Sequence, residues 1–160
     1  MALTTVMPTS SKLAFLRGEH AAADAYKMSL IKVGHTGTYD KTFAAAGTPN
    51  NSTGGAPSST NIGTDEVAAS GSYAAGGIAM AGYTNGTDST TNTAWIDWTT
   101  DPAATTATIS SVGAVIYNDT DVGKPVVSLH DFGGTVSSTA GTFTVTLPAA
   151  AAATAVVRLA

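Results

Sequence analysis

The stretch VGAVIYNDTDVGKPVVSLHDF, residues 112–132, is the densest apolar segment of the chain and decides its fold. It contains an apolar run (112–117), a polar connection with one Asn, two Asp and a Gly (118–124), and a second apolar run (125–132). Two runs rich in β-branched and aromatic residues around such a connection predict a pair of strands and their turn. Because both faces of each run are apolar, we expect these strands to lie at the centre of a stack of sheets, with other parts of the chain covering both of their faces.

Shorter segments around this hairpin carry the patterns of further strands and of one helix. Strands are predicted at residues 26–33, 78–83, 94–99, 107–110, 141–147 and 154–159. A short helix is predicted over residues 11–17, capped by Thr9 or Ser10 and ended by Gly18. Asn85-Gly86 is a turn signal, and Gly133-Gly134 is expected to break the chain between two strands. The fold class is therefore mainly β: a single domain (1–160) forming an antiparallel β-sandwich, or a barrel-like variant of it.

Residues 44–64, AAAGTPNNSTGGAPSSTNIGT, have no periodic apolar signal and are rich in Gly, Pro, Ser, Thr and Asn. A loop of this length inside a compact domain is usually functional or disordered. We expect a long loop or arm here, and if it is ordered we expect a neighbouring subunit to order it. Residues 1–11 form a second candidate extended segment.

Composition narrows the class of protein. Charged residues make up 11% of the chain, against about 25% in an ordinary soluble domain, and the net charge is −4. The seven Lys and Arg are spread along the chain, which argues against nucleic-acid binding. No apolar run approaches the roughly 18 residues of a membrane helix, and the first residues lack the pattern of a signal peptide. We therefore expect no membrane partner and synthesis in a cytoplasm. A surface of Thr, Ser, Gly, Ala and Asn favours a protein packed into an assembly or exposed outside a cell.

The chain is poor in the groups that catalysis and metal binding need. His20, His35 and His130 are far apart in sequence and have no metal-site spacing, and there is no cysteine. No nucleophile elbow or phosphate loop is present. His130 beside Asp131 is the one pair that could suggest a hydrolase, and neighbours of this kind arise by chance. We expect a protein that is not an enzyme, with no catalytic residue, cofactor or metal.

Two further motifs have a structural and a functional interpretation. The oxygen-rich sequence NDTD (118–121) resembles part of a calcium loop, but it lacks the Gly and distal Glu of an EF-hand, and turn residues bonded to their own backbone explain it better. Trp95 and Trp98, on opposite faces of one predicted strand, could stack on a sugar, but core packing is the better explanation.

Three short motifs follow one another along the chain: E-V-x-x-x-G-x-Y-x-x-G-G, then G-A-x-I-Y-N, then D-F-G. Their residues are Glu66, Val67, Gly71, Tyr73, Gly76, Gly77, Gly113, Ala114, Ile116, Tyr117, Asn118, Asp131, Phe132 and Gly133. In the order of these motifs the chain resembles a group of small structural proteins of tailed bacteriophages and prophages, and the resemblance covers most of the chain outside residues 41–64.

What this resemblance implies is a virion component that is assembled in the host cytoplasm. The leading expectation is a capsid decoration (cement) protein, a homo-oligomer with a trimer favoured, that bridges subunits of the major capsid protein. The alternative is a tail or fibre-associated protein that contacts host glycans through exposed aromatics such as Trp95 or Tyr83. For the cement function, contacts are expected in the N-terminal segment and the long loop, at Leu3, Val6, Met7, Pro8, Pro49, Asn50, Pro57 and Ile62.

Overall fold

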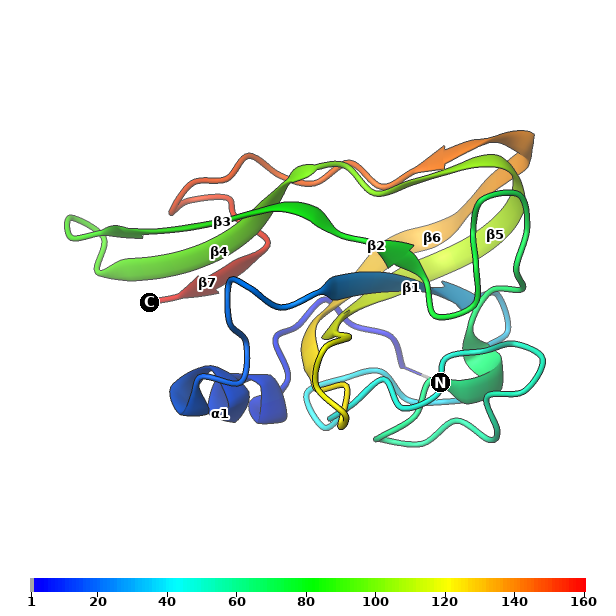
Figure 1. Ribbon diagram of the computed structural model, residues 1–160, viewed down its shortest axis with the longest axis horizontal. Coiled ribbons are helices and arrows are strands. Elements are labelled where there is room, and N and C mark those ends of the chain that lie inside the picture. Colours follow the sequence, from blue (N-terminus) through cyan, green and yellow to red (C-terminus); the bar gives the residue numbers. More distant parts are fainter. Residues whose placement is uncertain (1) are drawn as a thin grey trace.

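The computed structural model describes residues 2–160 and contains one α-helix and two antiparallel sheets (Figure 1). The four-stranded sheet has the order β2-β1-β5-β6, and the three-stranded sheet has the order β3-β4-β7. The elements are α1 (Thr9–Arg17), β1 (Tyr26–Lys32), the 3-10 helix η1 (Gly63–Asp65), β2 (Ile78–Ala79), β3 (Ala81–Asp88), β4 (Thr93–Thr100), β5 (Ala103–Asn118), β6 (Val126–Thr144) and β7 (Val157–Leu159). This sandwich-like, mainly β architecture confirms the predicted fold class.

The stretch 112–132 forms the centre of the four-stranded sheet, as predicted. The end of β5 pairs antiparallel with the start of β6, with Ile116 opposite Ser128, and the polar connection joins them. On its other edge β5 pairs antiparallel with β1, where Met28 lies opposite Ile116. Residues 113–118 are all buried, which explains why both faces of this run are apolar.

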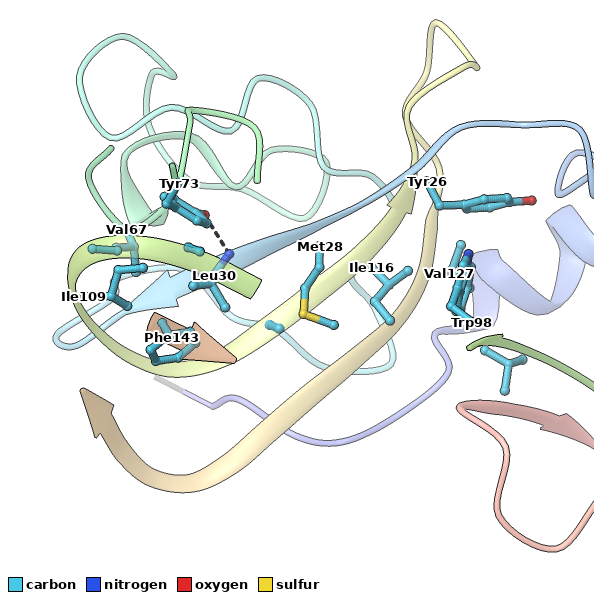
Figure 2. Packing of buried hydrophobic residues seen from close by; sticks show 14 residues of the cluster. Tyr26, Met28, Leu30, Val67, Tyr73, Trp98, Ile109, Ile116, Val127 and Phe143 are labelled. Atoms are coloured by element: carbon cyan, nitrogen blue, oxygen red, sulfur yellow. Dashed lines mark hydrogen bonds between the residues drawn. The ribbon is translucent and has the colours of Figure 1, made fainter. Parts of the chain in front are cut away.

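One face of the four-stranded sheet packs against the three-stranded sheet in what we call the inter-sheet core. Figure 2 shows Tyr26, Met28 and Leu30 of β1 in this core, with Trp98 of β4 beside Tyr26. The Tyr26 and Trp98 rings meet edge to face, with 5.3 Å between their centroids. Alternate residues of β1 therefore hold the two sheets together.

The opposite face is covered by loops in what we call the loop-side core. Ile31, Val115 and Leu129 of the sheet pack against side chains from two segments. One is the N-terminal segment before β1, and the other is the long connection after β1. The covering side chains are Leu3, Val6, Tyr39, Phe43, Ala46 and Ile62. Both faces of the central hairpin are thus covered, one by a sheet and one by loops.

Helix α1 is present, but its start differs from the prediction. Thr9 and Ser10 lie inside the helix, the N-cap residue is Pro8, and no side chain caps the first turn. The end agrees with the prediction, because Gly18 adopts the left-handed conformation with φ 73° and its N–H bonds back into the last turn.

The turn predicted at Asn85-Gly86 is wrong, since both residues lie within β3 opposite Ile96 and Trp95. The type I′ turn that Asn-Gly favours needs positive φ at both central positions, and neither Asn85 nor Gly86 has a positive φ. The chain reverses four residues later, where the Asp88 side chain accepts a 2.8 Å bond from the Thr90 N–H.

The break predicted at Gly133-Gly134 is a bulge rather than an end. β6 continues through it to Thr144, but the register with β5 shifts there, so that Gly113 faces Asp131 while Ser111 faces Val136. Gly133 supplies a φ of 73°, which lets the strand bend without stopping. The strand predicted at 141–147 is therefore partly the end of β6.

Candidate interaction surface

The predicted contact residues of the N-terminal segment lie against their own chain. The Thr4 N–H donates to the Tyr39 carbonyl at 3.0 Å, and Val6 pairs with Leu129 through bonds of 3.0 and 2.9 Å. Leu3 and Val6 pack on the loop-side core, while Met7 packs on the inter-sheet core. Pro8 is buried, and Met1 lies outside the described residues. This segment completes the fold of its own subunit.

The predicted contact residues of the long loop are also partly or fully enclosed. Ile62 is fully buried in the loop-side core, and Pro49 is buried. Pro57 is half-buried, and so is Asn50, whose Oδ1 accepts bonds from two backbone N–H groups that follow it. A contact role for all eight residues stays a prediction, and the buried ones present no surface to a partner in this conformation.

The long loop is ordered by bonds within the chain, with Asn61 at their centre. The Asn61 Oδ1 accepts from the Thr48 N–H at 2.8 Å, and its Nδ2 donates to the carbonyls of Gly54 and Ala56 at 2.8 and 3.1 Å. The Ile62 N–H also donates to the Ala46 carbonyl at 2.8 Å. A neighbouring subunit is therefore not required to order this loop, contrary to the sequence-based expectation.

The motif that begins at Glu66 forms a buried hydrogen-bond network against β1. We call this network, made by Glu66, Tyr73 and Gly76, the clasp. Oε1 of Glu66 accepts bonds from the Ser29 hydroxyl (3.1 Å), the Tyr73 hydroxyl (2.9 Å) and the Gly76 N–H (2.8 Å). The Tyr73 hydroxyl in turn accepts from the Leu30 N–H at 2.9 Å, the bond drawn in Figure 2. Glu66 is fully buried, and this burial raises the pKa of its carboxyl. Sequence reasoning did not assign these residues a role.

Glycine is required at the end of this clasp because the backbone passes against β1. A Cβ on Gly77 would lie 2.2 Å from the Met28 carbonyl oxygen, and the residue has a φ of 97°. A side chain at this position therefore meets both a backbone clash and an unfavourable conformation. Glu66, Tyr73, Gly76 and Gly77 of the E-V-x-x-x-G-x-Y-x-x-G-G motif thus each have a structural role in the fold.

Burial of acidic side chains leaves the surface nearly neutral. Three of the eleven acidic residues, Asp65, Glu66 and Asp97, are fully buried, so eight acidic side chains remain against seven basic ones. Asp65 accepts bonds from the N–H groups of Thr36 and Gly37 and from the Tyr39 hydroxyl. The surface thus has few charges and almost no net charge.

The histidines do not form a common site. The His130 ring bonds to the Ser128 hydroxyl at 2.9 Å, and burial lowers the pKa of His130 to about 4. The neighbouring Asp131 is exposed and accepts from the Gly133 N–H at 2.8 Å. His20 packs beside Phe15, with 4.6 Å between ring centroids. Within residues 2–160, no three His, Asp or Glu side chains gather as metal ligands would.

The NDTD sequence works as a turn, which confirms the turn interpretation. Asn118 Oδ1 accepts from the Thr120 N–H at 2.9 Å, and Asp121 Oδ1 accepts from the Gly123 N–H at 2.8 Å. Asp119 forms ion pairs with Lys27 at 2.9 Å and with Lys124.

Three of the six large apolar side chains that are exposed among residues 2–160 lie on α1 and on the β5–β6 connection. Leu13 and Leu16 on α1 are 45% and 85% exposed, and Val122 at the tip of the connection is fully exposed. The Asn118 side chain ties this connection to the segment after α1 through the Glu19 carbonyl at 2.8 Å. In Figure 1 the helix, the connection and residues 44–64 all lie along the lower side of the molecule. We call these three segments the lower face.

The aromatic residues considered for glycan contact differ in environment. The Tyr83 ring stacks 5.7 Å from the Tyr26 ring and meets Trp98 edge to face at 5.9 Å, so it belongs to the packing between the sheets. Trp95 is half-buried, and its ring lies over Gly86 of the neighbouring strand. A groove of about 310 Å³ runs between Phe15 of α1 and this sheet and has both Tyr83 and Trp95 in its lining.

Comparison with known proteins leaves these surfaces without a counterpart. No protein-family model matches the chain, and neither curated proteins nor solved structures gave a significant match. No helix in residues 2–160 is long and apolar enough to cross a membrane. The resemblance to bacteriophage structural proteins therefore stays a prediction.

Proposed function

We propose that this chain is a structural protein of a bacteriophage virion, a capsid decoration protein that bridges and stabilises major capsid subunits without enzymatic activity. The observation that carries the proposal is the lower face, where Leu16 and Val122 are exposed on two segments that the Asn118–Glu19 hydrogen bond joins. Apolar side chains that gather on one exposed face favour contact with another protein. The motifs that resemble phage proteins give the class of particle.

The nearly neutral surface supports an assembled role. A clamp on a capsid must remove water from its contact surface, and each charge left without a partner there costs free energy. With three acids buried inside the subunit and few other charges, this cost is small. The subunits are expected to act as a homo-oligomer, with a trimer favoured, so that each particle contact is made several times over.

The direct experiment is to locate the protein in the particle whose genome encodes it. Purified protein is added to expanded capsids that lack it, and the decorated capsids are imaged by electron cryomicroscopy. The proposal predicts density over the seams between major capsid subunits, with α1 and the β5–β6 connection facing the shell. Density confined to the tail tip, or no binding to the shell, would refute it.

A tail or fibre-associated protein that contacts host glycans is the second candidate, and Trp95 favours it. Its half-exposed indole over Gly86 offers a flat apolar surface on which a sugar ring could stack. Here a glycan array should show binding that the Trp95→Ala variant loses. An array without any signal, together with unchanged adsorption of particles carrying Trp95→Ala, would exclude this function.

A further inference from the structure

The outer edge of β3 is an open strand edge. β3 pairs with β4 on one side in a constant register from Ala81 opposite Thr100 to Asp88 opposite Thr93. Figure 1 shows β3 at the rim of the three-stranded sheet, and β7 closes the opposite rim. Among residues 2–160, no backbone bond from another segment reaches this outer edge. An edge of this kind presents alternating free N–H and C=O groups, which another strand can pair with.

This edge also lacks the features by which proteins usually protect a strand edge. Its sequence, AGYTNGTD, contains no Lys and no Pro, and Asp88 at its end is its only charge. The other edges differ: β2 has two residues, β7 has three and carries Arg158, and β6 is bridged by Val6 and then bulged at Gly133. Apart from Gly82, which has a φ of 75°, β3 is an unpaired edge in constant register, whereas the free part of β6 beyond Gly133 pairs with β5 in a register that shifts between Ala104 and Ile109.

We propose that β3 pairs antiparallel with β3 of a second copy of this chain, around a two-fold axis at Asn85, to make one continuous six-stranded sheet. Asn85 of one copy then faces Asn85 of the other, and Tyr83 faces Thr87. The inference goes beyond the proposed capsid function and does not depend on it, because pairing is a property of the free protein.

The distribution of charge makes the second copy a compatible partner. In this register Asp88 lies opposite Gly82 of the other copy, so the one acidic side chain of each strand meets no like charge. An isologous contact of this kind closes on itself and gives a dimer, or links larger oligomers in pairs. It differs from the ring contacts of a trimer.

A charge-swap experiment tests the pairing. Asn85 is exposed, so Asn85→Lys and Asn85→Glu leave the core intact, and like charges then face each other across the axis. In analytical ultracentrifugation the wild type should rise with concentration from one chain of 15.9 kDa towards twice that mass. Each variant alone should dimerise at least about tenfold more weakly, and a 1:1 mixture of the two should recover the wild-type constant.

The matched control is Thr135→Lys, which places the same charge at an exposed position on the free part of β6. It should dimerise like the wild type, and all variants should keep the wild-type melting temperature. A wild type that stays monomeric, a trimer unaffected by Asn85→Lys, or a mixture that fails to associate would overturn the proposal. These outcomes leave the capsid experiment untouched, so the two proposals fail separately.

Discussion

The two sheets differ in how much of their faces and strand edges the rest of the chain covers. The four-stranded sheet is covered on both faces, and behind β1 it is fastened by the clasp of Glu66 and Tyr73. In the three-stranded sheet, which shares the inter-sheet core, β3 pairs with β4 on one side, and its outer edge has no backbone partner among residues 2–160. The four-stranded sheet thus has both of its faces packed, whereas the three-stranded sheet presents the unpaired edge of β3 to solvent. The motif that begins at Glu66 therefore stabilises the four-stranded sheet, and function is to be sought at the surfaces that this sheet supports.

The largest effect is expected from breaking the scaffold at Gly77. Gly77→Ala should lower the free energy of unfolding by about 3 kcal/mol, because its Cβ would meet the Met28 carbonyl at a strained φ. For a chain of this size, that corresponds to a fall of roughly 6–12 °C in melting temperature. The control is Gly134→Ala, since a Cβ there has nothing within 4 Å. Equal melting temperatures for the two variants would contradict the close approach of the clasp to β1.

The clasp should also make stability depend on pH through Glu66. Burial raises the pKa of Glu66 above its ordinary 4.5, so the folded state holds this proton to higher pH than the unfolded state does. The stability contributed by the protonated form is therefore present below pH 4.5 and is lost as pH rises through the folded pKa.

Glu66→Gln removes this ionisation. The difference in free energy of unfolding between Glu66→Gln and the wild type should grow in favour of the variant between pH 4.5 and 7, as measured by urea unfolding at each pH. A difference in free energy of unfolding that does not change with pH would show that burial does not raise the pKa of Glu66.

A smaller effect is expected in the long loop. Asn61→Ala removes three bonds and should cost about 1–3 kcal/mol, much of it as local opening of residues 48–60. Limited proteolysis with thermolysin should then cut this region faster than in the wild type. Ser52→Ala is the control, because Ser52 is exposed and its hydroxyl has no bond within the described chain. Equal cleavage rates in the wild type and Asn61→Ala would mean that Asn61 does not order the loop.

The smallest effect on stability is expected on the lower face. Leu16→Ser and Val122→Ser change side chains that are 85% and 100% exposed, so each should shift the free energy of unfolding by no more than about 0.5 kcal/mol. Thermal unfolding by circular dichroism measures this. A larger loss in either variant would place its side chain in the core of the free subunit rather than on a contact surface.

The sequence predicted the fold where apolar periodicity was strong. The hairpin in 112–132, β1 and the end of α1 at Gly18 follow from local rules that the structure keeps. Asn85-Gly86 and Gly133-Gly134 misled because tertiary pairing overrode their turn tendency: β4 holds the first pair in a strand, and a bulge absorbs the second.

The candidate surface was less predictable than the fold. No periodic signal shows that Ile62 is a core residue or that Asn61 bonds to three loop positions. Both sets of contacts form only when the folded chain brings separate segments together. For the same reason, contacts assigned to Pro8 and Pro49 fell on buried side chains. The sequence predicts the helix that carries Leu16, but only the structure shows that this side chain faces away from the core.

The central claim, that the lower face binds and stabilises a capsid, is tested most directly by the temperature at which particles release their DNA. Particles stripped of this protein are decorated again with the wild type, with Leu16→Ser/Val122→Ser, or with Thr135→Lys, and DNA release is followed with an intercalating dye during heating. The account predicts that the wild type and Thr135→Lys raise the release temperature and that the double variant does not. A release temperature that is the same with and without the wild-type protein would contradict it.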